Sequence, residues 1–244
     1  MNASNHPATG DEPDESASSL FEKQWQIYRK IVDNNYAFHR EVYGELHRVL
    51  ANDAVQPFRF LDIACGDASM TVTALRGTRI AHYHGIDLSE AALDLARRAL
   101  AELTCPIILE RRDYVEALRD HPQPVDVVWI GYSLHHLRAS AKLALMREIR
   151  GAVGDGGLFL MCEPASPDDE DRSAWLHRYE RLNQPLWTAL TPEEWDAVMT
   201  HVRAADFPET SSRWYALGRE AGFSEVREVF VAPDDLHRMY CLRA

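Results

Sequence analysis

The sequence has few basic side chains and no long apolar run. Its 244 residues include 26 Lys and Arg against 38 Asp and Glu, so the formal net charge is −12. Nonspecific binding to nucleic acid depends on clustered positive side chains, and this composition therefore argues against a nucleic-acid partner. No stretch of about 18 apolar residues is present that could span a membrane, so we expect no membrane partner either.

Cysteine is scarce as well, and no two cysteines have the CxxC spacing of a metal or redox motif. The four are Cys65, Cys105, Cys162 and Cys241. Reduced thiols in a cytosolic protein explain this usage best. The N-terminal residues lack the basic and then apolar pattern of a signal peptide. We therefore expect a cytoplasmic protein, and the choice between a monomer and a homodimer stays open.

The hydrophobic pattern divides the chain into five parts. Residues 1–18 are polar and acidic, which predicts a disordered tail. Residues 19–52 carry apolar side chains at three- and four-residue steps, which predicts helices interrupted near the "DNN" at 33–35. Residues 53–163 alternate between strand and helix patterns. Strands are expected at 58–63, 80–86, 106–111, 125–130 and 157–163, with helices at 69–76, 89–102, 114–120 and 139–152.

The alternation stops after residue 163. Residues 164–208 show helix signals without a strand, including a capping box at "TPEE" (191–194), so we expect a helical insertion. Residues 209–244 predict a last helix and two strands, whose short connection at 233–235 fits an antiparallel hairpin. The fold class is therefore α/β: a doubly wound, mostly parallel, seven-stranded Rossmann-like sheet with a C-terminal antiparallel hairpin and a helical cap.

The turn after the first strand is poor in glycine. It reads "ACGDAS", with Gly66 as its only glycine and Asp67 directly after it. A dinucleotide pyrophosphate needs bare backbone N–H groups at this turn, and a carboxylate there would repel it. S-adenosylmethionine (SAM) instead carries an ammonium and a sulfonium and no phosphate, so Asp62 and Asp67 could neutralise its amino acid end. The turn therefore favours SAM over a nicotinamide dinucleotide.

Four stretches in order resemble the motifs of the class I SAM-dependent methyltransferases, of the type that acts on small molecules. "FLDIACGDA" is similar to the first motif: it keeps the acid as Asp62 and the middle glycine as Gly66, with Ala64 and Ala68 in the places of the outer glycines. "HGIDLSEAALDLARRAL", "RRDY" and "VDVVWIGYSLHHL" resemble the second, third and fourth motifs. The resemblance is closest over residues 58–163.

The resemblance implies SAM as the cofactor, S-adenosyl-L-homocysteine as the product, and a binding role for each motif. Asp87 would hold the ribose hydroxyls, with Leu88 against the adenine. Asp113 would accept a hydrogen bond from the adenine amino group, and Tyr114 would lie beside the ring. Residues 131–136 would line the face of methyl transfer. The expected cofactor-binding residues are Asp62, Ala64, Gly66, Asp67, Asp87, Leu88, Asp113, Tyr114, Tyr132, Ser133 and, from the N-terminal helices, Tyr28.

The methyl group of SAM is transferred by an in-line displacement on an activated sulfonium, so the enzyme mainly supplies alignment. A general base is required only where the acceptor loses its proton early. His39, His136 and Glu163 are the candidates for that role. A metal is not expected, because the adjacent His135 and His136 converge poorly on one ion and the sequence shows no third ligand.

In this fold the N-terminal helices at 19–52 and the insertion at 164–208 close the acceptor pocket, and both regions are rich in aromatic residues here. Such walls suit a flat or apolar small molecule. We therefore expect a methyltransferase that acts on an oxygen or nitrogen nucleophile of a small molecule. Two alternatives remain: a SAM-binding sensor or partner protein without transfer activity, and a nicotinamide-dependent oxidoreductase. At least half of the aromatic residues are expected to be core; they are Trp25, Tyr28, Tyr36, Trp175, Tyr179, Trp187, Trp195, Trp214 and Tyr215.

Overall fold

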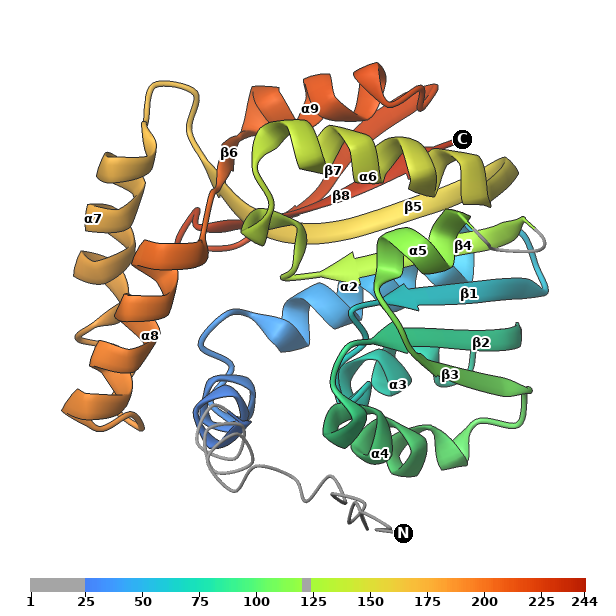
Figure 1. Ribbon diagram of the computed structural model, residues 1–244, viewed down its shortest axis with the longest axis horizontal. Coiled ribbons are helices and arrows are strands. Elements are labelled where there is room, and N and C mark those ends of the chain that lie inside the picture. Colours follow the sequence, from blue (N-terminus) through green and yellow to red (C-terminus); the bar gives the residue numbers. More distant parts are fainter. Residues whose placement is uncertain (1–24, 120–123) are drawn as a thin grey trace, which may run out of the picture.

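The computed structural model describes residues 25–119 and 124–244. The predicted acidic tail, residues 1–18, lies outside this range. A central sheet carries helices on both faces, and α7 (Arg172–Asn183) and α8 (Pro192–Ala205) stand beyond the carboxyl ends of the central strands (Figure 1). Within the described residues, no helix is both long and apolar enough to cross a membrane.

Seven of the eight strands in the sheet lie in the order β3-β2-β1-β4-β5-β8-β7, and the eighth, β6 (Glu209–Thr210), pairs with β5. β1 to β5 pair in parallel, whereas β8 is antiparallel to both β5 and β7. The predicted doubly wound sheet with a C-terminal antiparallel hairpin is confirmed. The strands are β1 (Phe58–Ile63), β2 (Ile80–Asp87), β3 (Ile107–Arg111), β4 (Val125–Gly131), β5 (Val153–Ser166), β7 (Glu225–Val231) and β8 (His237–Arg243).

The helices begin and end close to the expected positions. Residues 25–33 are helical, and a turn at 34–37 separates them from α2 (His39–Asn52), as the "DNN" indicated. The predicted capping box is present at the start of α8, where the side chains of Thr191 and Glu194 each accept from the backbone N–H of the other. The remaining helices are α3 (Ser69–Leu75), α4 (Glu90–Ala99), α5 (Tyr114–Arg119), α6 (Ala139–Ala152) and α9 (Ser211–Glu220), with 3-10 turns η1 (Leu100–Glu102) and η2 (Leu134–His136).

Alternating side chains of the central strands form two hydrophobic cores, one on each face of the sheet. Leu61 and Ile63 of β1 point to the face covered by α5, α6 and α9, whereas Phe58 and Phe60 point to the face covered by α2, α3 and α4. Neighbouring strand residues take opposite faces because the side-chain period of a strand is two. A third cluster holds α7 and α8 together. Its buried members are Trp175, Tyr179, Trp187, Trp195, Met199, Val202 and Leu236.

One strand boundary differs from the expected one, and one additional strand is present. β5 begins before the "GDGG" at 154–157, so these residues lie inside the strand and do not end α6. The early start is possible because Val153 pairs with Val125 before the register of the two strands shifts. A two-residue strand, β6 (Glu209–Thr210), pairs with β5 where the start of a helix was expected. The insertion is therefore tied back to β5 just before α9.

Candidate active site

The turn between β1 and α3 follows a glycine-type path although two alanines stand in it. Ala64, Gly66 and Ala68 have φ values of 54°, 55° and 52°, all in the left-handed region. An alanine there costs on the order of 1–2 kcal/mol, because its Cβ crowds the following carbonyl. The two alanines therefore adopt the conformation that glycine would adopt, at a cost in stability.

Asp87, at the end of β2, is bonded to this turn. One carboxylate oxygen accepts from the Gly66 N–H at 2.9 Å, and the other accepts from the Ser89 N–H at 2.8 Å. Asp87 is half-buried, and a carboxylate can accept about four hydrogen bonds, so capacity remains for a ribose diol. The neighbouring Leu88 is exposed. This placement is compatible with the expected roles of Asp87 and Leu88.

Asp62 is buried near the carboxyl end of β1, where it accepts a hydrogen bond from the Tyr83 hydroxyl at 2.7 Å. Burial raises the pKa of Asp62 to about 7, although hydrogen bonds from Tyr83 and Thr71 act in the opposite direction. A carboxyl group with this pKa ionises near neutral pH, and a cationic ligand would favour the ionised form. Asp62 is therefore suited to act as the counter-ion of an ammonium group.

Asp67 already has partners within the protein. Its Oδ1 accepts from the Ser69 N–H and hydroxyl, at 3.1 and 2.8 Å, and its Oδ2 lies 3.6 Å from the guanidinium of Arg29. A direct contact between Asp67 and the SAM ammonium would have to displace Arg29. The geometry argues against this predicted role and favours a structural one. Asp67 fixes the start of α3 and ties the helical segment 25–33 to the turn.

Asp113 follows β3 and caps α5. Its Oδ1 accepts from the N–H groups of Val115 and Glu116, at 2.9 and 3.2 Å. Tyr114 is half-buried beside it, and burial together with the charge of Asp113 raises the pKa of the Tyr114 hydroxyl. Because β2 and β3 are parallel neighbours, Asp87 and Asp113 lie at the same edge of the sheet. Ligands of open α/β sheets bind at this edge.

Glu163 is completely buried in β5, and its carboxylate takes four contacts from the loop after β4. Oε1 accepts from the N–H groups of Ser133 and Leu134, at 3.2 and 2.9 Å. Oε2 accepts from the His135 N–H at 3.1 Å and lies 2.7 Å from His135 Nδ1. Each carboxylate oxygen already has two contacts, so neither has a free position for a substrate proton. The expected role of Glu163 as a general base is not supported, because its geometry is that of a residue that positions the loop.

His39 and Tyr132 pack together, with ring centroids 4.8 Å apart. The Tyr132 hydroxyl donates to the Ala37 carbonyl at 2.8 Å, and Tyr132 has a positive φ of 55°. His39 is buried, its Nδ1 has no hydrogen-bond partner, and burial lowers its pKa to about 4. His39 is therefore neutral at physiological pH, and its low basicity argues against it as the principal general base.

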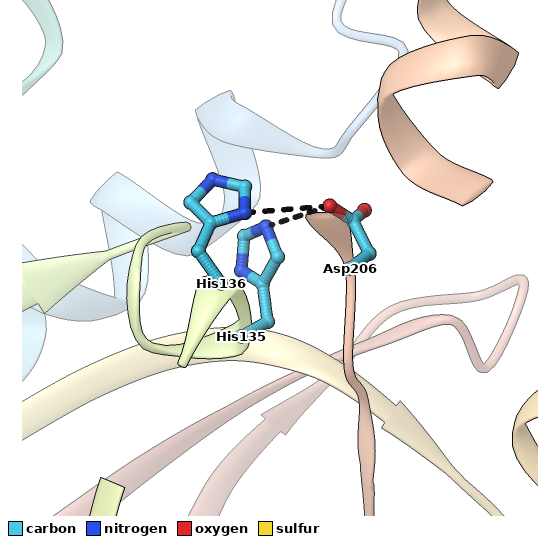
Figure 2. A group of neighbouring side chains, drawn as sticks. All are labelled: His135, His136 and Asp206. Carbon is cyan, nitrogen blue, oxygen red and sulfur yellow. Dashed lines mark ion pairs between the residues drawn. The ribbon is translucent and has the colours of Figure 1, made fainter. Parts of the chain in front are cut away.

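The two histidines of "SLHHL" meet Asp206, which directly follows α8. His136 Nδ1 lies 3.4 Å and His135 Nε2 lies 3.6 Å from the same Asp206 oxygen, and Figure 2 shows both rings directed at it. Burial lowers the pKa of His136, but the nearby Asp206 carboxylate outweighs this effect and leaves the pKa raised. His136 is also exposed. Of the three predicted bases, it is the one best placed to reach a bound molecule.

Asp206 is a site residue that the sequence did not reveal. It stands alone between α8 and β6, in "AADFPE", and nothing in that stretch resembles a motif. The sequence showed no third ligand beside the two histidines, whereas the structure places one Asp206 oxygen 3.6 Å from His135 and 3.4 Å from His136. Only the packing of α8 against the loop after β4 brings these residues together.

A cavity of about 740 Å³ lies between the helical segment 25–33, the insertion and the loop after β4. The motif acids Asp62, Asp87 and Asp113 do not line it. Tyr28 and Tyr132 do line it, and both were expected to contact the cofactor. The cavity therefore lies next to the expected cofactor site.

Some of the aromatic residues singled out in the sequence reach this cavity. Tyr28, Tyr179 and Trp187 line it. Trp175 and Trp214 are completely buried away from it, which agrees with the expectation that many of these rings are core. The walls of the cavity are therefore mixed, with histidines and acids beside the aromatic rings.

Residues 60–157 match the protein family described as Methyltransferase domain. Over these residues the match, the sheet order and the four motifs are those of a class I SAM-dependent methyltransferase domain. SAM is the cofactor that the four motifs predict for that domain.

Several known proteins are similar to this chain. Carboxy-S-adenosyl-L-methionine synthase of Campylobacter lari (strain RM2100) is 22% identical over 181 residues, which are 70% of this chain and 75% of that protein. An O-methyltransferase family protein from Burkholderia thailandensis has a TM-score of 0.63 at 17% identity, over 88% of this chain and 59% of its own. Magnesium protoporphyrin IX methyltransferase from Synechocystis PCC 6803, with S-adenosylhomocysteine bound, has a TM-score of 0.59 at 13% identity, over 93% and 94% of the two chains. The chain thus spans less than two thirds of the Burkholderia protein, and the likeness to the solved structures shows a shared fold.

Proposed function

We propose that this protein transfers the methyl group of SAM to an oxygen or nitrogen atom of a small molecule. The main support is the cavity of about 740 Å³, since small-molecule sites typically measure roughly 300–1,000 Å³. The cavity adjoins the loop after β4, next to the point between β1 and β4 where the strand order reverses. Ligands of doubly wound sheets bind near that point. An acceptor in the cavity would face the methyl group of a cofactor held by the motif residues.

In the proposed reaction the acceptor attacks the methyl carbon opposite the sulfur, and S-adenosylhomocysteine is the leaving group. Alignment supplies most of the acceleration, up to about 7–11 kcal/mol, because the sulfonium is already activated. Asp62 would pair with the SAM ammonium and Asp87 would accept from the ribose. Tyr132 and Ser133 would shape the transfer face. His136 would accept the proton of an acceptor that loses it early.

The proposed acceptor is flat or partly apolar and carries a polar nucleophile. Tyr28, Tyr179 and Trp187 provide aromatic surface in the cavity, and the histidines at its edge provide polar contacts,. The net charge of −12 works against an RNA acceptor,. One structural relative is named as the methyltransferase of magnesium protoporphyrin IX, which agrees with a small-molecule acceptor. A cytoplasmic location belongs to the same proposal and is supported by the four free cysteines,.

A combined binding and turnover measurement on the full chain tests this function. We expect SAM to bind in calorimetry, and mass spectrometry to detect S-adenosylhomocysteine in the presence of phenols, carboxylic acids or amines. SAM binding without S-adenosylhomocysteine formation across such a panel would favour the sensor alternative. Binding of NAD in place of SAM would favour the oxidoreductase alternative and would overturn the proposal.

A further inference from the structure

Four side chains from two distant parts of the chain meet at one edge of the cavity. His135 and His136 come from η2, His201 lies near the end of α8, and Asp206 follows that helix. The Nε2 of His135, the Nδ1 of His136 and the Nε2 of His201 lie 3.6, 3.4 and 3.9 Å from one oxygen of Asp206. Histidine nitrogens and a carboxylate oxygen are the ligands that Zn²⁺ takes in proteins.

The separations within this cluster suit ligands of one metal ion better than hydrogen bonds. Hydrogen-bonded nitrogen and oxygen atoms lie about 2.7–3.2 Å apart. Two ligand atoms that each lie about 2.1 Å from a tetrahedral ion are about 3.4 Å apart. The candidate ligand atoms of His135, His136 and Asp206 all lie within 4.8 Å of one another. An ion at their centre would therefore require only small side-chain movements.

The Asp206 oxygen at the centre of the cluster has no hydrogen-bond partner, although Asp206 is only 6% exposed. A buried carboxylate oxygen without a donor is costly, and such a group points to a missing partner. His135 does not supply the donor where it bonds Glu163 through its Nδ1–H, because its Nε2 then carries a lone pair,. In that tautomer two acceptors face each other across 3.6 Å, and a cation between them would resolve the conflict.

Glu163 gives His135 the support that metal-binding histidines usually have. Such a histidine bonds a carboxylate or carbonyl through its second nitrogen, which fixes the ring and its tautomer. One contact competes with coordination: His136 Nδ1 lies 3.3 Å from the Ala205 carbonyl, a long contact that a metal bond would replace. We propose that His135, His136 and Asp206 bind a divalent transition-metal ion of the Zn²⁺ type. All three residues line the cavity together with His201, so a molecule in the cavity could take a fourth position on the ion,.

The open position suggests a role for the ion in binding the acceptor, and this step rests on the proposed function. An oxygen of the acceptor, from a phenol or a carboxylate, would take the fourth position. His136 would then be a ligand and not a base, and the ion would lower the pKa of a bound hydroxyl. Removal of the ion should raise the KM for the acceptor and leave the affinity for SAM unchanged. An unchanged acceptor KM in the metal-free protein would contradict this role.

Metal titration of the chelator-treated full chain tests the site without SAM or an acceptor. We expect one Zn²⁺ per chain, and Co²⁺ in its place should give the intense visible bands of a four-coordinate ion. Asp206→Asn should lower the affinity for Zn²⁺ about 100-fold, and Glu163→Gln, which acts through His135, about 10–100-fold. Asp196→Asn and His177→Ala change exposed residues of α8 and α7 and serve as matched controls. Both controls should bind Zn²⁺ as the parent protein does.

Two results would overturn the metal site: no stoichiometric binding of Zn²⁺ or Co²⁺, or binding that Asp206→Asn leaves unchanged. Circular dichroism shows whether each variant keeps the fold. If Asp206→Asn or Glu163→Gln does not keep the fold, His136→Ala is tested in its place, because it removes an exposed ring. A chain that binds Zn²⁺ through these residues but forms no S-adenosylhomocysteine would contradict the proposed function and leave the metal site standing. Full transfer activity in a chain that binds no metal would contradict the metal site and leave the proposed function standing.

Discussion

Glu163 and His135 are joined by a contact of 2.7 Å between Oε2 and Nδ1. The same carboxylate accepts from the backbone N–H groups of Ser133, Leu134 and His135. One buried side chain of β5 therefore holds both the backbone and the first histidine of the loop after β4. The shape of that loop is set before any ligand binds, and the position of His136 follows from it.

Glu163→Gln should lower both stability and turnover. The amide NH₂ would face backbone N–H donors, and each buried polar group left without a partner costs about 1–3 kcal/mol. We expect the free energy of unfolding to fall by about 1–3 kcal/mol in urea denaturation, and kcat to fall while the affinity for SAM changes little. Glu116→Gln, at an exposed position of α5, is the control. Parent-like stability and kcat in Glu163→Gln would rule out the positioning role.

Asp87→Ala should weaken SAM binding by more than tenfold. The substitution removes the predicted acceptor of the ribose hydroxyls and also the bond from the Gly66 N–H that holds the turn. Isothermal calorimetry measures the change, and Asp94→Ala, an exposed acid on α4, controls for the loss of one charge. Equal affinity in Asp87→Ala and the parent protein would remove the ribose assignment.

The affinity for SAM should rise with pH up to about 7 and then level off. The pKa of Asp62 in the free protein is raised to about 7, mainly by burial, and the SAM ammonium pairs with the ionised form,. Below that pH, binding must first remove a proton, so the affinity should fall up to about tenfold per pH unit. Asp62→Asn should bind more weakly and without this dependence. A parent protein with a flat profile between pH 5 and 8 would exclude Asp62 as the counter-ion.

The raised pKa of Asp62 also makes the stability of the fold depend on pH. This stability decreases as the pH rises, whereas the affinity for SAM increases. The folded chain holds the proton more tightly than the unfolded chain, whose Asp pKa is about 3.9,. The stabilising contribution is therefore complete below about pH 4 and is lost as the pH rises through 7. Urea unfolding of the parent protein and of Asp62→Asn between pH 5 and 8 checks this. The free energy of unfolding of the parent, relative to that of Asp62→Asn, should decrease as the pH rises.

Ala64→Gly should stabilise the protein by up to about 1 kcal/mol. Glycine relieves the strain of the positive φ at Ala64, although it also makes the unfolded chain more flexible,. Ala74→Gly is the matched control: it places glycine inside α3 and should destabilise by about 1 kcal/mol,. Thermal unfolding compares the two. Similar losses of stability in both variants would show that the turn is not strained at Ala64.

Much of the fold could be predicted because local pattern and long-range pairing agree. The run from Phe58 to Ile63 has apolar side chains on both faces, which is typical of a central parallel strand buried by helices on both faces,. The acids that follow β1, β2 and β3 could be placed at one edge of the sheet, because parallel strands end on the same side. The start of β5 was wrong because the pairing of Val153 with Val125 overrides the glycines that follow.

The finer contacts of the site could not be predicted, since they depend on the path of loops in space. Asp67 was assigned to the cofactor on its charge alone, but Arg29 of the N-terminal helical segment lies beside it. Glu163 was assigned as a base from its place at a strand end, but the N–H groups of the next loop point at it. Asp206 reaches the histidines only through the packing of the insertion. None of these contacts produces a periodic pattern in the sequence from which it could be predicted.

Calorimetric titration of the full chain with SAM and with S-adenosylhomocysteine tests the central claim most directly. We predict saturable heat with both ligands, one site per chain, and a more than tenfold weaker affinity in Asp87→Ala. No heat with either ligand at millimolar concentration would contradict the account, because the acids at the ends of β1, β2 and β3 would then have no adenosyl ligand to hold.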